Sequence, residues 1–172
     1  MKTDSLFYRL FQEQPGLVFE LADWPLPAGA LYTLHAEEVK QTSFRLDGLL
    51  LPPPEPPDLP VVFVEVQFQR DDDFYSRWFT ELFLFLRQQR WQRPWRAVAI
   101  FPSRATDMPP SVAYQPLLAI PWVKRVYLED LKERADLPPG LQLIQLIMAE
   151  PAAAVSQAQA LLMVRGGPSS GP

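Results

Sequence analysis

Two short apolar runs in the first half of the chain flank a proline-rich segment, and each run contains an acidic residue. The first run covers residues 42–51 and contains Asp47, and the second covers residues 61–68 and contains Glu65. Runs of this length and composition are typical of strands. Residues 52–60 contain six prolines and cannot join a sheet, because proline lacks the N–H donor. We therefore expect a hairpin with a stiff, exposed connection, an SH3-type ligand being the alternative for that segment.

The two acidic residues predict a metal site. A carboxylate within an apolar run is unfavourable to bury unless it is paired or binds a cation. Strand side chains alternate between faces, so Glu65 and Gln67 share a face and Asp47 can stand opposite Glu65. Two ionised carboxylates this close repel each other, and oxygen ligands favour Mg²⁺ or Mn²⁺. The alternative is a polar pair at a strand end that is satisfied by Arg45 or Arg77.

The remaining patterns indicate an α/β fold. Helical and strand-like periods alternate along the chain, which predicts a mixed central sheet flanked by helices. We expect one domain over residues 1–150, followed over 151–172 by a helical segment and a disordered tail. The expected elements are a helix over 4–14, strands over 31–40, 42–51 and 61–68, a helix over 74–89, strands over 96–101 and 122–128, and a helix over 141–150.

Composition excludes some classes of protein. The chain has no cysteine, which rules out disulfides and thiolate metal sites and fits a reducing cytoplasm. It has no apolar stretch long enough to span a bilayer and no apolar signal segment at its start, so we expect a soluble cytoplasmic protein. The net charge of −4 argues against a surface that grips nucleic acid everywhere.

A local basic and aromatic cluster nevertheless offers a nucleic-acid contact. Its arginines are interleaved with Trp91 and Trp95, and such a patch can hold a phosphate backbone while the rest of the surface stays acidic. The alternative is a solvated helix end, where cations also suit the helix dipole. The arginines of this cluster are Arg87, Arg90, Arg93 and Arg96.

Four segments carry a resemblance to a known family. The chain resembles the PD-(D/E)XK nuclease superfamily, and more closely the Rpn-like recombination-promoting nucleases, which are transposase-like, and the DUF2887 proteins. The resemblance covers roughly the first 130 residues. It implies a restriction-endonuclease-like αβββαβ core, dependence on Mg²⁺ or Mn²⁺, and hydrolysis of phosphodiester bonds in DNA during recombination or the movement of mobile elements. The segments are residues 4–11, 40–48, 64–67 and 73–77.

The resemblance also implies roles for individual residues. Asp47 matches the metal-binding Asp of the motif, Glu65 matches the second acidic ligand, and the backbone carbonyl of Val66 matches a third ligand. Gln67 occupies the position of the motif Lys. Glutamine can hydrogen-bond a water but brings no positive charge to a phosphoryl transition state. Arg77 is expected either to provide that charge or to pair with Asp73.

The leading hypothesis is a metal-dependent DNA endonuclease in which Asp47, Glu65 and Gln67 form the catalytic site. DNA is the expected partner, with RNA as the alternative, and Arg77 joins the arginine cluster as a candidate contact. A second hypothesis is a weakly active or inactive member of the fold that binds nucleic acid or protein. A third is an assembly role, with apolar C-terminal segments forming a homodimer, which is compatible with the first.

Overall fold

The computed structural model describes residues 2–27, 29, 31–39, 44–132 and 134–149. They form a compact unit over Met1–Tyr127 and a second unit that begins at Leu128. In the first unit the elements are α1 (Lys2–Glu13), α2 (Gly16–Leu21), β1 (Thr33–Val39), β2 (Phe44–Leu51), β3 (Val61–Val66), α3 (Phe74–Gln88), β4 (Trp95–Phe101), α4 (Gln115–Leu118) and β5 (Val123–Tyr127). The second contains the 3₁₀ helix η1 (Leu128–Leu131) and α5 (Pro139–Met148).

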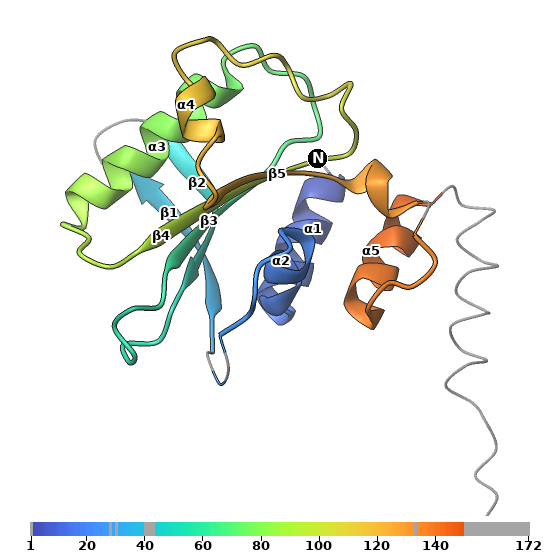
Figure 1. Cartoon of the computed structure of the whole chain (residues 1–172), viewed down its shortest axis with the longest axis horizontal. Coiled ribbons are helices and arrows are strands. Elements are labelled where there is room, and N and C mark those ends of the chain that lie inside the picture. The colour runs from blue at the N-terminus through green and yellow to red at the C-terminus, as the bar shows by residue number, and fades with distance from the viewer. Residues whose placement is uncertain (1, 28, 30, 40–43, 133, 150–172) are drawn as a thin grey trace, which may run out of the picture. The chain divides into compact units, whose positions relative to one another are not determined.

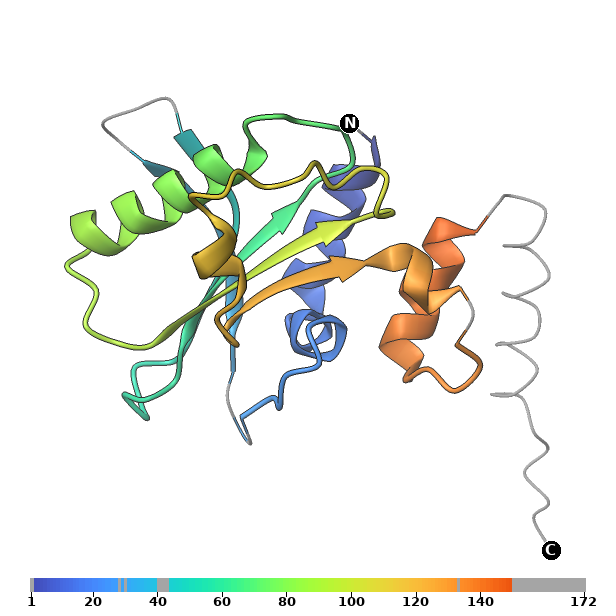
Figure 2. The same cartoon turned by 45° about the horizontal axis from the view of Figure 1, so that its top comes forward.

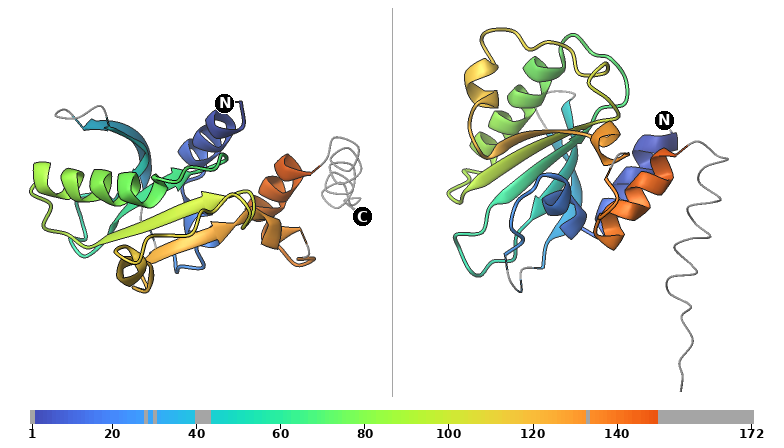
Figure 3. Two further views of the ribbon diagram at one scale, coloured as in Figure 1. Left: turned by 90° about the horizontal axis from the view of Figure 1, so that it is seen from above. Right: turned by 45° about the vertical axis from the view of Figure 1, so that its right-hand side comes forward.

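The first unit is a five-stranded mixed sheet in the order β1-β2-β3-β4-β5. Strands β1, β2 and β3 pair antiparallel, whereas β3, β4 and β5 pair in parallel, as their common arrow direction shows in Figure 2. Helix α3 lies on one face, and α1 and α2 lie on the other (Figures 1 and 3). The predicted mixed α/β sheet flanked by helices is confirmed.

Aromatic side chains of α3 form the core on its face of the sheet. Trp78 and Leu82 lie one turn apart on this helix and are both fully buried. They belong to one apolar cluster with Ala97 and Ala99 of β4, whose small side chains leave room for the large rings. Phe63 of β3 contributes a ring contact to the same layer. Full burial of a side chain of this kind stabilises the fold by about 1.5–3 kcal/mol.

The central strands are buried on both faces. Val62 and Val64 of β3 and Val98 of β4 alternate with the residues that face α3, and all three are buried. Strands covered by helices on both sides read as continuous apolar runs, which explains the sequence of β3. An ionisable residue within such a strand is largely shielded from water. Glu65 is in this position.

A β-bulge distorts β2 at the point where its pairing with β3 begins. His35 pairs with Leu49 and Glu37 pairs with Leu46, so two residues of β2, Asp47 and Gly48, stand opposite a single residue of β1. Such an insertion bends the strand and is common beside functional sites. A Cβ atom on Gly48 would lie 3.0 Å from Cδ1 of Leu34. Glycine therefore allows the close approach of β1 and β2 at the bulge.

The predicted order of the long elements is correct, with end positions within three residues of those observed. The short helices α2 and α4, of six and four residues, were not predicted because they offer too few turns for a periodic pattern. The helix and tail expected over residues 151–172 lie outside the described residues. No helix in the described part of the chain is long and apolar enough to cross a membrane.

Candidate functional site

A buried carboxylate near the end of β3 anchors the candidate site. Glu65 is 1% exposed and lies on the α3 face of the sheet, as Phe63 does. Arg77 of α3 donates a hydrogen bond of 2.9 Å from Nη1 to Oε1 of Glu65. This charged hydrogen bond compensates for the loss of water around the carboxylate. The sequence offered Arg45 or Arg77 as the partner of a polar pair at this strand end. The structure shows that Arg77 contacts Glu65.

Arg77 connects three further groups around Glu65. Its Nη2 atom donates to Oε1 of Gln67 at 3.4 Å and to Oδ2 of Asp71 at 3.3 Å. Its Nη1 atom also lies 3.7 Å from Oε1 of Glu81, one turn along α3. Burial works to lower the pKa of Arg77, but the negative charges of Glu65 and Glu81 outweigh it and raise that pKa. The guanidinium therefore stays charged under all ordinary conditions.

The turn before α3 is closed by Asp71 and not by the residue at the N-cap position. Asp73 occupies the N-cap position without a side-chain capping bond. Instead, Oδ1 of Asp71 accepts the backbone N–H of Asp73 at 3.0 Å, which closes an Asx-type turn. Asp73 contacts Arg77 through its backbone carbonyl, which accepts the Arg77 N–H at 2.9 Å. The ion pair of Arg77 in this turn is with Asp71 rather than with Asp73.

Gln67 is held at both ends of its side chain. Its Nε2 atom donates to the carbonyl of Gln69 at 2.5 Å, while its Oε1 accepts from Arg77. Its backbone N–H donates to the carbonyl of Ile100 at 2.9 Å, which extends the β3–β4 pairing one residue beyond Val66. A positively charged guanidinium from another element, α3, therefore lies next to the side chain of Gln67.

The backbone of β2 shows where Asp47 lies relative to β3. Gly48 pairs with Val64 across the β2–β3 ladder, and this register continued by one residue aligns Asp47 with Glu65. The side chain of Asp47 lies outside the described residues. Among those that are described, no group of three or more His, Asp or Glu side chains is placed to hold a metal ion. The metal set of Asp47, Glu65 and the Val66 carbonyl stays a prediction.

The predicted arginine cluster does not form one surface. Arg93 donates three hydrogen bonds, of 2.8–3.0 Å, to backbone carbonyls of the proline-rich connection. Its guanidinium thus holds that connection in place. Arg96 lies on the opposite face of the sheet from α3, over the ring of Trp24. Arg87 is exposed on α3. Arg90 follows the end of that helix in a left-handed conformation, with φ of 48°.

Sequence reasoning missed a second polar cluster, centred on Asp107 in the loop after β4. Tyr75 donates to Oδ1 of Asp107 at 2.5 Å, and Tyr127 donates to its Oδ2 at 2.6 Å. Arg125 forms an ion pair of 3.2 Å with the same Oδ2. Burial and the hydrogen bond to Asp107 raise the pKa of Tyr127 to about 12 and also raise that of Tyr75. Nothing in the local sequence around Asp107 signals this cluster.

Glu81 was also missed, although a signal for it exists. It is an acidic residue within the apolar α3 segment and is 1% exposed. The reasoning that singled out Glu65, a carboxylate in an apolar run, applies equally to Glu81. The helical period then places Glu81 on the same side of α3 as Arg77. Two buried acids from different elements therefore share one guanidinium.

Comparison with known proteins identifies the family. The family described as "Protein of unknown function (DUF2887)" matches residues 3–166. The chain belongs to this family. No curated protein and no solved structure matches it. The DUF2887 description assigns no activity.

Proposed function

We propose that this DUF2887 chain is a metal-dependent DNA endonuclease of the PD-(D/E)XK type, with its active site at the end of β3. The observation that carries the proposal is the position of Arg77. Its guanidinium lies 2.9 Å from Glu65 and 3.4 Å from Gln67, beside the residue that replaces the motif Lys. The order of a helix, three strands, a helix and a strand also supports a restriction-endonuclease-like core.

The donor atoms at this position fit a hard divalent cation. Glu65 and Asp47 offer carboxylates and Val66 offers a carbonyl, so every proposed ligand is an oxygen, as Mg²⁺ and Mn²⁺ prefer. Gly48 pairs with Val64, so Asp47 and Glu65 are the next residues in register on the two neighbouring strands, which supports a shared role. When bound, the ion would lower the pKa of a water and offset negative charge on the scissile phosphate.

The residues of the chain have distinct tasks in this proposal. The contact with Arg77 orients Glu65, and the buried position limits the number of conformations that its carboxylate adopts. Gln67 can hydrogen-bond a water or a phosphate oxygen but carries no charge. Arg77 supplies the positive charge for a phosphoryl group, and its 30% exposed side chain remains accessible from solvent.

A second candidate function is that of a catalytically inactive member of the fold that binds nucleic acid or protein. The contacts of Glu65 and Gln67 favour it, because Arg77 occupies an oxygen of each side chain. A closed ion-pair network of this kind can serve the structure alone. The two candidates differ in one measurable property, the dependence of strand cleavage on a divalent metal.

The test is plasmid nicking by the purified chain with Mg²⁺ or Mn²⁺, set against EDTA. We expect metal-dependent nicking that is lost in Asp47→Asn and in Glu65→Gln. Glu20→Gln is the matched control, since Glu20 is exposed on α2. All proteins are first shown by circular dichroism to be folded. Nicking by Glu65→Gln at the wild-type rate would reveal a contaminant, and a folded wild type that neither binds metal nor nicks would refute the enzyme.

A further inference from the structure

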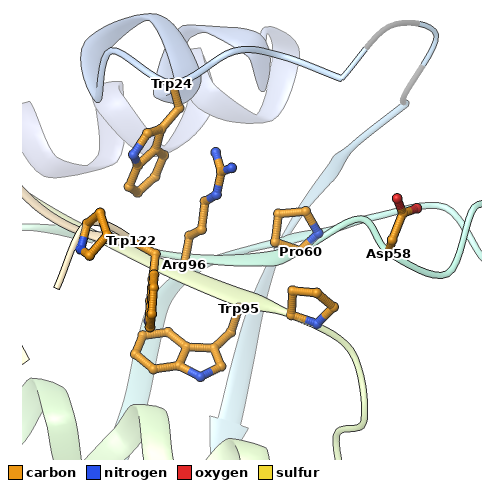
Figure 4. Close-up of a pocket in the computed structure, with 8 residues that line it drawn as sticks. Trp24, Asp58, Pro60, Trp95, Arg96 and Trp122 are labelled. Carbon is orange, nitrogen blue, oxygen red and sulfur yellow. The ribbon is translucent and has the colours of Figure 1, made fainter.

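A pocket of about 580 Å³ lies away from Glu65, among the segments that lead into the parallel strands (Figure 4). Its walls include Trp24, Trp95 and Trp122 together with three prolines. Arg96 and Asp58 are the charged residues among those that line it. This volume is typical of sites that enclose a small organic ligand, roughly 300–1,000 Å³. Apolar walls with a few polar groups are also typical of such sites.

The sheet topology creates this pocket. Because β3, β4 and β5 are parallel, their first residues meet at one edge, where Val61 pairs with Trp95 and Ala97 pairs with Val123. Pro60 and Trp122 immediately precede two of these strands. The Pro60 carbonyl accepts the hydroxyl hydrogen of buried Tyr32 at 3.0 Å, which holds this wall in place. The pocket is therefore formed before any ligand arrives.

The guanidinium of Arg96 is not paired with the carboxylate of Asp58, the other charged residue of the lining. Its guanidinium lies 5.0 Å from the ring centroid of Trp24, toward which the side chain extends in Figure 4. Within the described part of the chain it forms no ion pair, and its Nη1 atom is buried without a hydrogen-bond partner. A buried donor left unsatisfied is destabilising, and more so when it is charged. An anion bound beside Arg96 would relieve this.

The other lining groups indicate which further chemical groups a ligand with that anion would carry. The indole of Trp122 is 44% exposed and offers a flat surface for a planar ring. Asp58 lies beyond Pro60 from Arg96 in Figure 4 and can accept hydrogen bonds from hydroxyl or amino groups. An anion, a planar ring and hydroxyl groups are combined in a nucleotide. We propose that this pocket binds a mononucleotide, with its phosphate on Arg96 and its base against Trp122.

This site is separate from the proposed active site and does not depend on it. Arg96 pairs in register with Val62, whereas Glu65 pairs with Ala99, three residues further along β4. That separation corresponds to about 10 Å along the strand. The two side chains also lie on opposite faces of the sheet, since Arg96 meets Trp24 and Glu65 meets α3. A nucleotide bound here would act as an effector rather than as the cleaved strand.

The experiment is a titration of the full chain with AMP, followed by tryptophan fluorescence in the presence of EDTA. Three of the five tryptophans line the pocket, so binding should produce a saturable change. We expect Arg96→Gln to weaken AMP binding at least about tenfold, because a charged hydrogen bond is lost. Arg87→Gln, at an exposed position of α3, is the matched control and should leave the affinity unchanged. Adenosine and inorganic phosphate alone should each bind at least about tenfold more weakly than AMP.

Several outcomes would overturn the proposal. One is the absence of any saturable change with AMP in a folded wild type. Equal binding of AMP and adenosine would remove the role of the phosphate, and unchanged affinity in folded Arg96→Gln would remove that of Arg96. If that variant does not fold, Trp122→Ala decides, since it should weaken AMP binding several-fold. Self-association that Trp122→Ala abolishes, measured by light scattering, would assign the pocket to a second copy of the chain instead.

Discussion

Replacement of Arg77 by methionine removes the guanidinium from between Glu65 and Glu81 while it keeps much of the apolar stem. Both acids are 1% exposed, so each would lose a charged partner where few water molecules can replace it. Removing one member of a buried ion pair destabilises a protein by about 3–5 kcal/mol. The Arg77 side chain is 30% exposed, and water can replace part of its field. We therefore expect the lower end of this range, about 3 kcal/mol.

The loss is measurable by urea unfolding and by thermal melting. A change of about 3 kcal/mol corresponds to a fall of roughly 6–12 °C in Tm for a chain of this size. The pairing itself is isolated by a double-mutant cycle with Glu65→Gln. Since the double variant carries no unpaired charge at Glu65, it should be at least about 1 kcal/mol more stable than the sum of the single effects predicts.

Arg87→Met is the control on the same helix. Arg87 is exposed and should change the free energy of unfolding by less than about 0.5 kcal/mol. The reasoning is refuted if Arg77→Met destabilises the chain by less than about 1 kcal/mol, or if the Arg77 and Glu65 effects add without coupling. Either result would mean that the guanidinium is not what stabilises the two buried acids.

Two other predictions concern Tyr127 and Arg93. The pKa of Tyr127 is raised from the ordinary value of 10.0 to about 12, so the associated stability is complete below pH 10 and is lost as the pH rises through 12. Tm should therefore fall above pH 10, and Asp107→Asn should move the phenolate absorbance titration of Tyr127 back toward 10. Arg93→Ala removes three bonds to the proline-rich connection and should destabilise the chain by about 2 kcal/mol in urea. An unchanged urea midpoint would contradict that structural role.

The local sequence was sufficient to find Glu65. A carboxylate within an apolar run must be paired or must bind a cation, whatever the rest of the fold, because its desolvation is a property of the strand that contains it. The sequence did not decide whether Arg45 or Arg77 is the partner of Glu65. It also did not decide whether Arg77 pairs with Asp73 or provides positive charge at the site. The structure brings Arg77 to Glu65 because the β3–α3 connection and the helical phase together set where that side chain reaches.

The arginine cluster illustrates the opposite case. Arg87, Arg90, Arg93 and Arg96 are close in sequence, but a helix end, a turn and a strand separate their side chains. Charge density along the chain therefore does not translate into charge density on a surface when the segment changes direction. The proline-rich connection is a long-range partner of Arg93, which a local pattern cannot reveal.

By itself, the sequence determined the order of the long helices and strands and the anomalous position of Glu65. These follow from side-chain period and solvation, which act over a few neighbouring residues. Only the tertiary structure decided that Glu81 shares the guanidinium of Arg77 and that Trp24 and Trp122 form one pocket around Arg96. These contacts join segments far apart in the chain, and they depend on sheet register and on the packing of α2 and α3, which no local pattern encodes.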